Sequence, residues 1–133
     1  MNPYPALAVL LGDSPEVSVP LGAIGGAGSG WTRYATIRPN GGNLVVSIYR
    51  HPVAEVRPDG SMELRTCGYY TASTRAALAL AVTGFPCNNY TVSMRTPGSR
   101  GGTPGPWRAE VRHNGTMTEV GDDWTAIGAE VAA

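Results

Sequence analysis

The residue types best suited to chemistry gather in one stretch, between a predicted strand and a predicted helix. The members that form a candidate binding site are Arg65, Tyr69, Tyr70, Thr71, Ser73, Thr74 and Arg75. Backbone N–H groups at a helix start attract anions, and tyrosine rings can stack on nucleobases. The stretch therefore predicts a site for an anionic partner, a nucleic acid or a nucleotide. The alternative interpretation is that the hydroxyls cap the helix while the tyrosines pack against a sheet.

The remaining reactive residues favour neither covalent catalysis nor metal binding. Cys67 with His51 or His113 could form a nucleophile and base pair, but histidines in hairpin turns are usually exposed and idle. Cys67 and Cys87 lack the paired spacing of a zinc site, so we expect free thiols, without predicting whether the two lie close. We therefore predict a protein that is not an enzyme, with no catalytic residues, no metal site and no cofactor.

Two further segments are similar to ligand-binding loops. Gly26–Gly30 is rich in glycine, but no lysine follows it and no helix is expected after it, so a linker is favoured over a phosphate-binding loop. The stretch 96–106 lies between Arg95 and Arg108 and carries Arg100. It could wrap a nucleic-acid backbone and become ordered on binding, or it could be a solvated connection.

Composition points to a single neutral domain rich in turns. The chain has 133 residues, and ten arginines balance ten acidic residues, with no lysine at all. A net charge of zero means that any attraction to an anion must be local. No apolar stretch approaches the ~20 residues of a membrane-spanning helix, and no positively charged leader precedes the first apolar run. We expect a cytoplasmic protein without membrane contact.

Glycine-containing turns between apolar runs predict three β-hairpins. The turns are Asn40-Gly41-Gly42, Asp59-Gly60 and Asn114-Gly115. The strands expected beside them are 32–38 and 43–49, 52–57 and 61–66, and 107–112 and 116–120. Residues 54–62 align with residues 109–117, which suggests an internal repeat of the hairpin, although turns of this kind also converge on similar sequences. Another strand is expected over 90–95.

One helix is expected from about Thr74 to Thr83. Ser73 or Thr71 can cap its start, and Gly84 ends it. Its apolar side chains are expected to pack on the sheet.

Residues 1–30 differ in composition from the remainder, because prolines divide short apolar pieces and a glycine run follows them. We expect an apolar N-terminal arm and linker over 1–30, followed by one β-rich domain over 31–133. The predicted fold class is α+β and β-rich, with an antiparallel sheet of about six or seven strands built from hairpins and one short helix packed on it.

The stretch from Tyr49 to Leu80 resembles a group of small uncharacterised proteins of tailed bacteriophages. The resemblance is carried by a hairpin and then by Thr66-Cys67-Gly68-Tyr69-Tyr70-Thr71-Ala72-Ser73-Thr74-Arg75. This chain has Cys67-Gly68-Tyr69 where that group has a Gly-Gly-Trp-like element. The resemblance implies a phage origin. It implies little else, because the group has no assigned activity.

The leading hypothesis is a phage-encoded binding module that contacts nucleic acid or a nucleotide at a helix N-terminus, in the cytoplasm of the infected bacterium. A second hypothesis is a structural or assembly protein of the virion that self-associates through residues 1–30. A third is an inhibitor that binds a host or defence protein.

Overall fold

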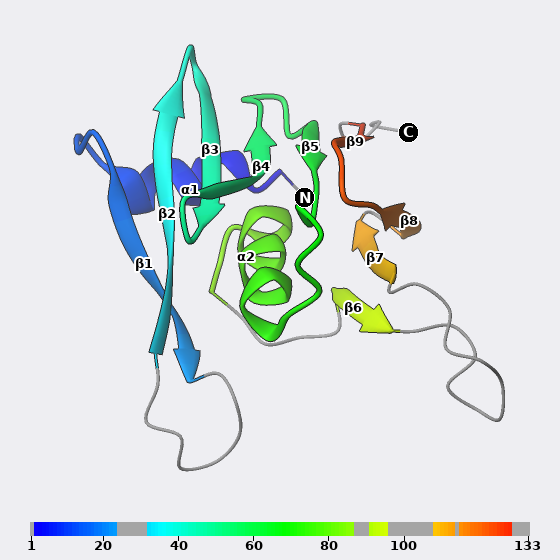
Figure 1. Cartoon of the computed structure of the whole chain (residues 1–133). Coiled ribbons are helices and arrows are strands. Elements are labelled where there is room, and N and C mark those ends of the chain that lie inside the picture. Colours follow the sequence, from blue (N-terminus) through cyan, green and yellow to red (C-terminus); the bar gives the residue numbers. More distant parts are fainter. Residues whose placement is uncertain (1, 24–31, 87–90, 96–107, 114, 129–133) are drawn as a thin grey trace, which may run out of the picture.

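The computed structural model describes residues 2–23, 32–86, 91–95, 108–113 and 115–128. These residues form two antiparallel sheets and two helices (Figure 1). The six-stranded sheet has the order β1-β2-β3-β4-β5-β9, and the three-stranded sheet has the order β6-β7-β8. The elements are α1 (Tyr4–Leu11), β1 (Val17–Ala23), β2 (Thr32–Asn40), β3 (Asn43–Ile48), β4 (His51–Val56), β5 (Met62–Leu64), α2 (Ala72–Thr83), β6 (Val92–Arg95), β7 (Arg108–His113), β8 (Thr116–Val120) and β9 (Thr125–Ile127). The β-rich α+β class with one main antiparallel sheet is confirmed.

The strands expected beside the three glycine-containing turns pair as hairpins. Gly41 and Gly42 both have positive φ, which produces the tight reversal between β2 and β3. In the β4–β5 reversal, Asp59 Oδ1 accepts hydrogen bonds from the backbone N–H and the hydroxyl of Ser61. The flanking strands β7 and β8 pair antiparallel, while Asn114 lies outside the described residues.

The two hairpins with similar sequences, β4–β5 and β7–β8, differ in register. Val56 is opposite Met62, whereas Arg112 is opposite Met117. Because successive side chains of a strand point to opposite faces, this shift buries Met62 and exposes Met117. The sequence likeness therefore corresponds to two different reversals.

Helix α2 lies between the two sheets, in contact with β3 and β4 on the main sheet and with β6 on the smaller one (Figure 1). Every residue from Ala77 to Val82 is buried, as expected of a helix covered on more than one side. Thr71 caps its N-terminus, and Gly84 ends it in the left-handed conformation, which confirms the predicted boundaries to within two residues. Among the described residues, no helix is long and apolar enough to cross a membrane.

The N-terminal segment differs from the expected arm, because it supplies a helix and an edge strand to the same core. β1 pairs with β2, and α1 packs against β1, β2 and β3 of the main sheet. Its buried side chains are Leu7, Leu11, Val19 and Leu21. Pro5 lies in the first turn of α1, where a missing N–H costs no helical hydrogen bond, so the proline does not prevent a helix. The glycine run at 25–30 lies outside the described residues.

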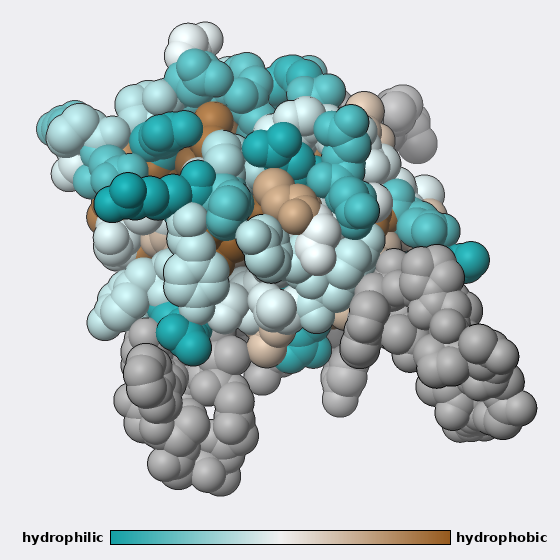
Figure 2. Space-filling model, in the orientation of Figure 1, coloured by the Kyte–Doolittle hydropathy of each residue, from teal (hydrophilic) through white to brown (hydrophobic). Residues whose placement is uncertain are grey.

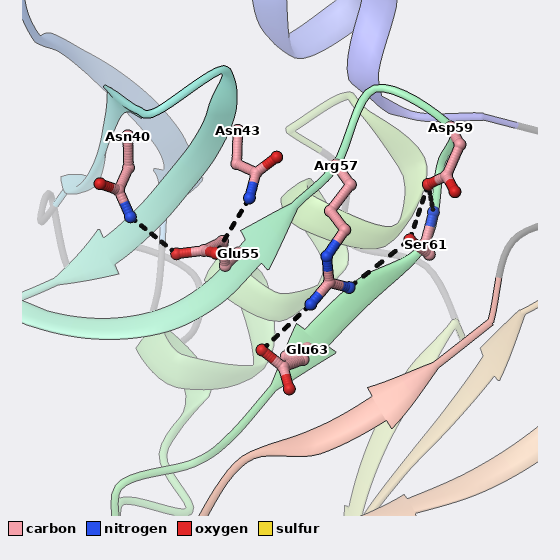
Figure 3. A network of polar contacts seen from close by, with 7 residues as sticks. All are labelled: Asn40, Asn43, Glu55, Arg57, Asp59, Ser61 and Glu63. Carbon is pink, nitrogen blue, oxygen red and sulfur yellow. Dashed lines mark hydrogen bonds and ion pairs between the residues drawn. The ribbon is translucent and has the colours of Figure 1, made fainter.

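Polar side chains link the β2–β3 and β4–β5 hairpins (Figure 3). Glu55 is opposite Glu63 across β4 and β5, which would bring two like charges together. The two oxygens of Glu55 accept hydrogen bonds from Asn40 Nδ2 at 3.0 Å and Asn43 Nδ2 at 3.1 Å. Arg57 Nη2 forms an ion pair with Glu63 Oε2 at 3.4 Å. These partners satisfy both carboxylates, so the cluster has a structural role.

Candidate binding site

A pocket of about 290 Å³ lies beside the N-terminus of α2. Its walls come from the end of β3, the start of β4 and the segment that leads into α2. The lining residues are Ile48, Tyr49, His51, Tyr69, Thr71 and Thr74. Three of these side chains carry rings and two are threonines, while none is a carboxylate. The face of the molecule in Figure 2 is mostly hydrophilic, with a few apolar residues at its surface.

The first wall is a two-residue reversal between β3 and β4 that contains no glycine. Ile48 and His51 form the last pair, and the two residues between them, Tyr49 and Arg50, have φ of 50° and 68°. A turn with positive φ at both positions normally takes Asn-Gly, because asparagine and glycine tolerate this conformation. Most other residues there cost about 1–2 kcal/mol each. The strained turn places Tyr49 and His51 on the pocket wall.

The second wall follows another reversal, at Cys67 and Gly68, with φ of 56° and 81°. The N–H of Gly68 donates to Thr66 Oγ1, and the N–H of Tyr69 donates to the Thr66 carbonyl. The Tyr69 ring then lies against His51, with ring centroids 5.1 Å apart and planes inclined by 36°.

Among the described residues, left-handed backbone at non-glycine positions is confined to these two reversals. In the part of the chain that the structure describes, such residues are Tyr49, Arg50 and Cys67. Backbone strain of this kind persists only where the surrounding structure holds it, and it is concentrated at functional sites. The strained backbone therefore indicates that the end of the molecule with the pocket is a candidate functional site.

Hydroxyl groups form the side of the pocket nearest α2. Thr71 Oγ1 accepts from the Thr74 N–H at 3.2 Å, and the two threonine hydroxyl oxygens are 3.2 Å apart. Thr74 is 1% exposed. The cap uses one of the first-turn N–H groups, and those of Ala72 and Ser73 have no intrahelical acceptor.

The loop between β8 and β9 anchors the segment before α2. Arg65 Nε donates to the Pro52 carbonyl at 2.7 Å, and the Arg65 guanidinium carbon lies 4.2 Å from the centroid of the Trp124 ring. The Tyr70 hydroxyl donates to Asp122 Oδ1 at 2.8 Å. Burial raises the pKa of Tyr70, and the Asp122 carboxylate adds to the rise. These contacts fix the second wall of the pocket.

The structure brings together three of the seven residues that the sequence singled out. Tyr69, Thr71 and Thr74 line the pocket. The other four have different environments: Arg65 stacks on Trp124, Tyr70 binds Asp122, Ser73 is buried in α2, and Arg75 is half-buried in its first turn. Hydroxyl capping, the alternative interpretation, applies to Thr71.

Ile48 and Tyr49 were not among the residues predicted from the sequence, and His51 was considered only as a possible base for Cys67. The only signal for them was an interruption of two apolar runs at Tyr49-Arg50-His51, which lacks the glycine or asparagine of an ordinary tight turn.

The cysteine and the histidines that could form a nucleophile and base pair make other contacts in the structure. The Cys67 thiol donates to the Pro52 carbonyl at 3.5 Å, while His51 lies on Tyr69. His51 is exposed as expected, whereas His113 is buried in the three-stranded sheet, contrary to expectation. No cluster of three metal-binding side chains occurs among the described residues. Cys87 and the stretch 96–106 lie outside them.

No protein-family model matches this chain, and no curated protein or solved structure shows significant similarity to it.

Proposed function

We propose that the protein is a non-enzymatic binding module whose pocket takes the base of a nucleotide, free or within a nucleic acid. The observation that carries the proposal is the pocket wall itself. Tyr49, His51 and Tyr69 present rings around a space of about 290 Å³, at two reversals that hold strained backbone. Aromatic side chains bind bases of any sequence through their π-faces.

The charges near the pocket suit the phosphate of such a ligand. Arg50 is exposed and lies between the lining residues Tyr49 and His51. The Arg33 guanidinium carbon lies 5.7 Å from the centroid of the Tyr49 ring. Because the whole chain is neutral, these arginines provide a local attraction to an anion without making the protein basic overall.

The test is a fluorescence titration with adenosine monophosphate and with a thymidine octanucleotide. We expect both to bind at low salt and the affinity to fall as salt increases. Tyr69→Ala should weaken binding at least fivefold, since one base loses its stacking partner. Tyr34→Ala is the matched control, because Tyr34 is 54% exposed on β2 and does not line the pocket. Absent or salt-independent binding, or an equal loss in both variants, would reject the proposal.

A phage origin and action in the cytoplasm of the infected bacterium remain part of this proposal. Their support is the sequence resemblance over residues 49–80, and this segment contains every lining residue except Ile48. Detection of the protein in purified virions would instead favour the assembly alternative.

The assembly alternative loses the observation that motivated it. The apolar side chains of the N-terminal segment, Leu7 and Val19 among them, are buried against the core of their own chain. For the third hypothesis, an inhibitor of a host or defence protein, nothing in the described residues favours a particular partner.

A further inference from the structure

We infer that the ligand is a single strand of nucleic acid several nucleotides long, which runs along one end of the six-stranded sheet from Tyr49 to Trp124. This inference rests on the proposed function, since the pocket serves as the first of two stacking positions. The second position is Trp124 with its partner Arg65.

Five adjacent strands place arginine and aromatic residues at the same end of the sheet. In an antiparallel sheet the end of each strand lies beside the start of its neighbour. The pairs Ile48 with His51 and Leu64 with Thr125 show this alignment at β3–β4 and β5–β9. The residues at this end, here called the Arg–aromatic row, are Arg33, Tyr49, His51, Tyr69, Arg65 and Trp124.

The row is longer than one nucleotide site requires. From β2 to β9 there are four spacings between neighbouring strands, which is roughly 19 Å at the usual separation. A mononucleotide in the pocket would leave the Trp124 end unused. A single strand would extend along it.

The rings of the row lie beside other side chains of the row and remain partly exposed to solvent. Tyr49 is 58% exposed beside Arg33, Tyr69 is 50% exposed beside His51, and Trp124 is 38% exposed beside Arg65. The Pro52 carbonyl holds Arg65 next to the strand start that carries His51. The row thus combines stacking surfaces with two guanidinium groups, one beside Tyr49 and one beside Trp124, and these suit the bases and phosphates of a single strand.

Acidic side chains lie at the Trp124 end of the Arg–aromatic row. Asp122 is engaged by the Tyr70 hydroxyl, and Asp123 Oδ1 accepts from the Trp124 N–H at 2.8 Å. Asp123 is exposed, so it would repel a phosphate that approached Trp124. The carboxylates of Glu55 and Glu63 are held by Asn40, Asn43 and Arg57 instead.

The experiment compares thymidine monophosphate with thymidine oligonucleotides of two, four and eight units, by fluorescence anisotropy or competition. Affinity should rise at least tenfold between the monophosphate and the tetramer. Trp124→Ala should weaken the tetramer at least fivefold and leave the monophosphate unchanged, and Trp124→Tyr should restore most of the loss. Asp123→Asn should tighten the tetramer. Phe85→Ala is the control, since Phe85 is 58% exposed outside the row.

The outcomes separate this inference from the proposed function. Binding of the monophosphate without a gain from length, and without an effect of Trp124→Ala or Asp123→Asn, overturns the single-strand inference alone. No binding of any probe overturns both, and specific capture of a folded protein partner that Trp124→Ala abolishes would replace them. If Trp124→Ala does not fold, the salt dependence of binding by the wild type decides. A plot of the logarithm of the octamer affinity against the logarithm of the salt concentration should fall with a slope of at least about 1.4, which corresponds to contacts with two phosphates.

Discussion

The hydroxyl of Tyr70 donates a 2.8 Å hydrogen bond to Oδ1 of Asp122 and so joins the segment before α2 to the loop between β8 and β9. The same oxygen lies 3.4 Å from the Thr66 hydroxyl, and the Thr66 N–H donates to the Gly121 carbonyl. A loop near the C-terminal end of the chain therefore holds a wall of the pocket, and the candidate site depends on contacts between segments that are distant in sequence.

Tyr70→Phe should lower the free energy of unfolding at pH 7 by about 1 kcal/mol, because it removes one hydrogen bond and leaves the ring in place. Urea denaturation measures the change. Tyr34→Phe, at an exposed position on β2, should have no measurable effect. An unchanged Tyr70→Phe variant would mean that the bond to Asp122 contributes nothing to the fold.

The stabilising effect of the Tyr70 hydroxyl should disappear at high pH. Burial raises the pKa of Tyr70 above its usual value of 10.0 in the folded state. Its contribution is therefore complete below pH 10 and is lost as the pH rises through the raised pKa. The difference in unfolding free energy between the wild type and Tyr70→Phe should be constant from pH 7 to 9 and shrink above about pH 10. A difference that grows with pH would contradict the assignment.

Replacing the strained turn by an ordinary one should stabilise the fold and impair binding. The double variant Tyr49→Asn with Arg50→Gly accepts positive φ at both positions, so the free energy of unfolding should rise by roughly 1–3 kcal/mol. The same change removes a pocket ring and the adjacent guanidinium, so nucleotide affinity should fall. Gly41→Asn, in a turn of the same kind, is the control and should leave binding intact. A stabilised variant with full affinity would show that the strain serves no ligand.

Gly84→Ala should destabilise the protein more than Gly115→Ala. The two glycines have nearly equal φ, 83° and 78°, so the backbone cost of a side chain is similar. A Cβ at Gly84 would lie 2.8 Å from the Cβ of Ala6 and 3.1 Å from the Pro3 carbonyl oxygen, whereas a Cβ at Gly115 meets nothing within 4 Å. We expect about 1–2 kcal/mol more destabilisation at Gly84, measured by thermal or urea unfolding. Equal losses would mean that α1 does not pack against the end of α2.

Leu7→Ala should cost about 2–5 kcal/mol of stability, because Leu7 is fully buried in the common core. Val9→Ala, on the same helix but 81% exposed, should change stability by less than about 0.5 kcal/mol. Urea denaturation of both variants separates a packed N-terminal helix from a detached arm, for which both substitutions would have the same small effect.

Local chemistry in the sequence was sufficient to predict the three hairpins with glycine-containing turns and the helix α2. Glycine at Gly42, Gly60 and Gly115 takes positive φ in each expected reversal, and Thr71 and Gly84 bound the helix as their types predict. Such features depend on a few neighbouring residues, so they can be inferred without knowledge of the tertiary structure. Helix α1 was missed because prolines near its start were interpreted as marks of an irregular arm.

The pocket, in contrast, was decided by tertiary structure. Tyr49 and Arg50 are poor turn residues, and they form a reversal only because β3 and β4 are held together by the sheet around them. His51 meets Tyr69, and Arg65 meets Trp124, because antiparallel pairing aligns the ends of strands that are far apart in the chain. The sequence by itself determined the strands beside the three glycine-containing turns and the helix α2. Which side chains face one another depended on strand order and register, which arise from packing over the whole domain.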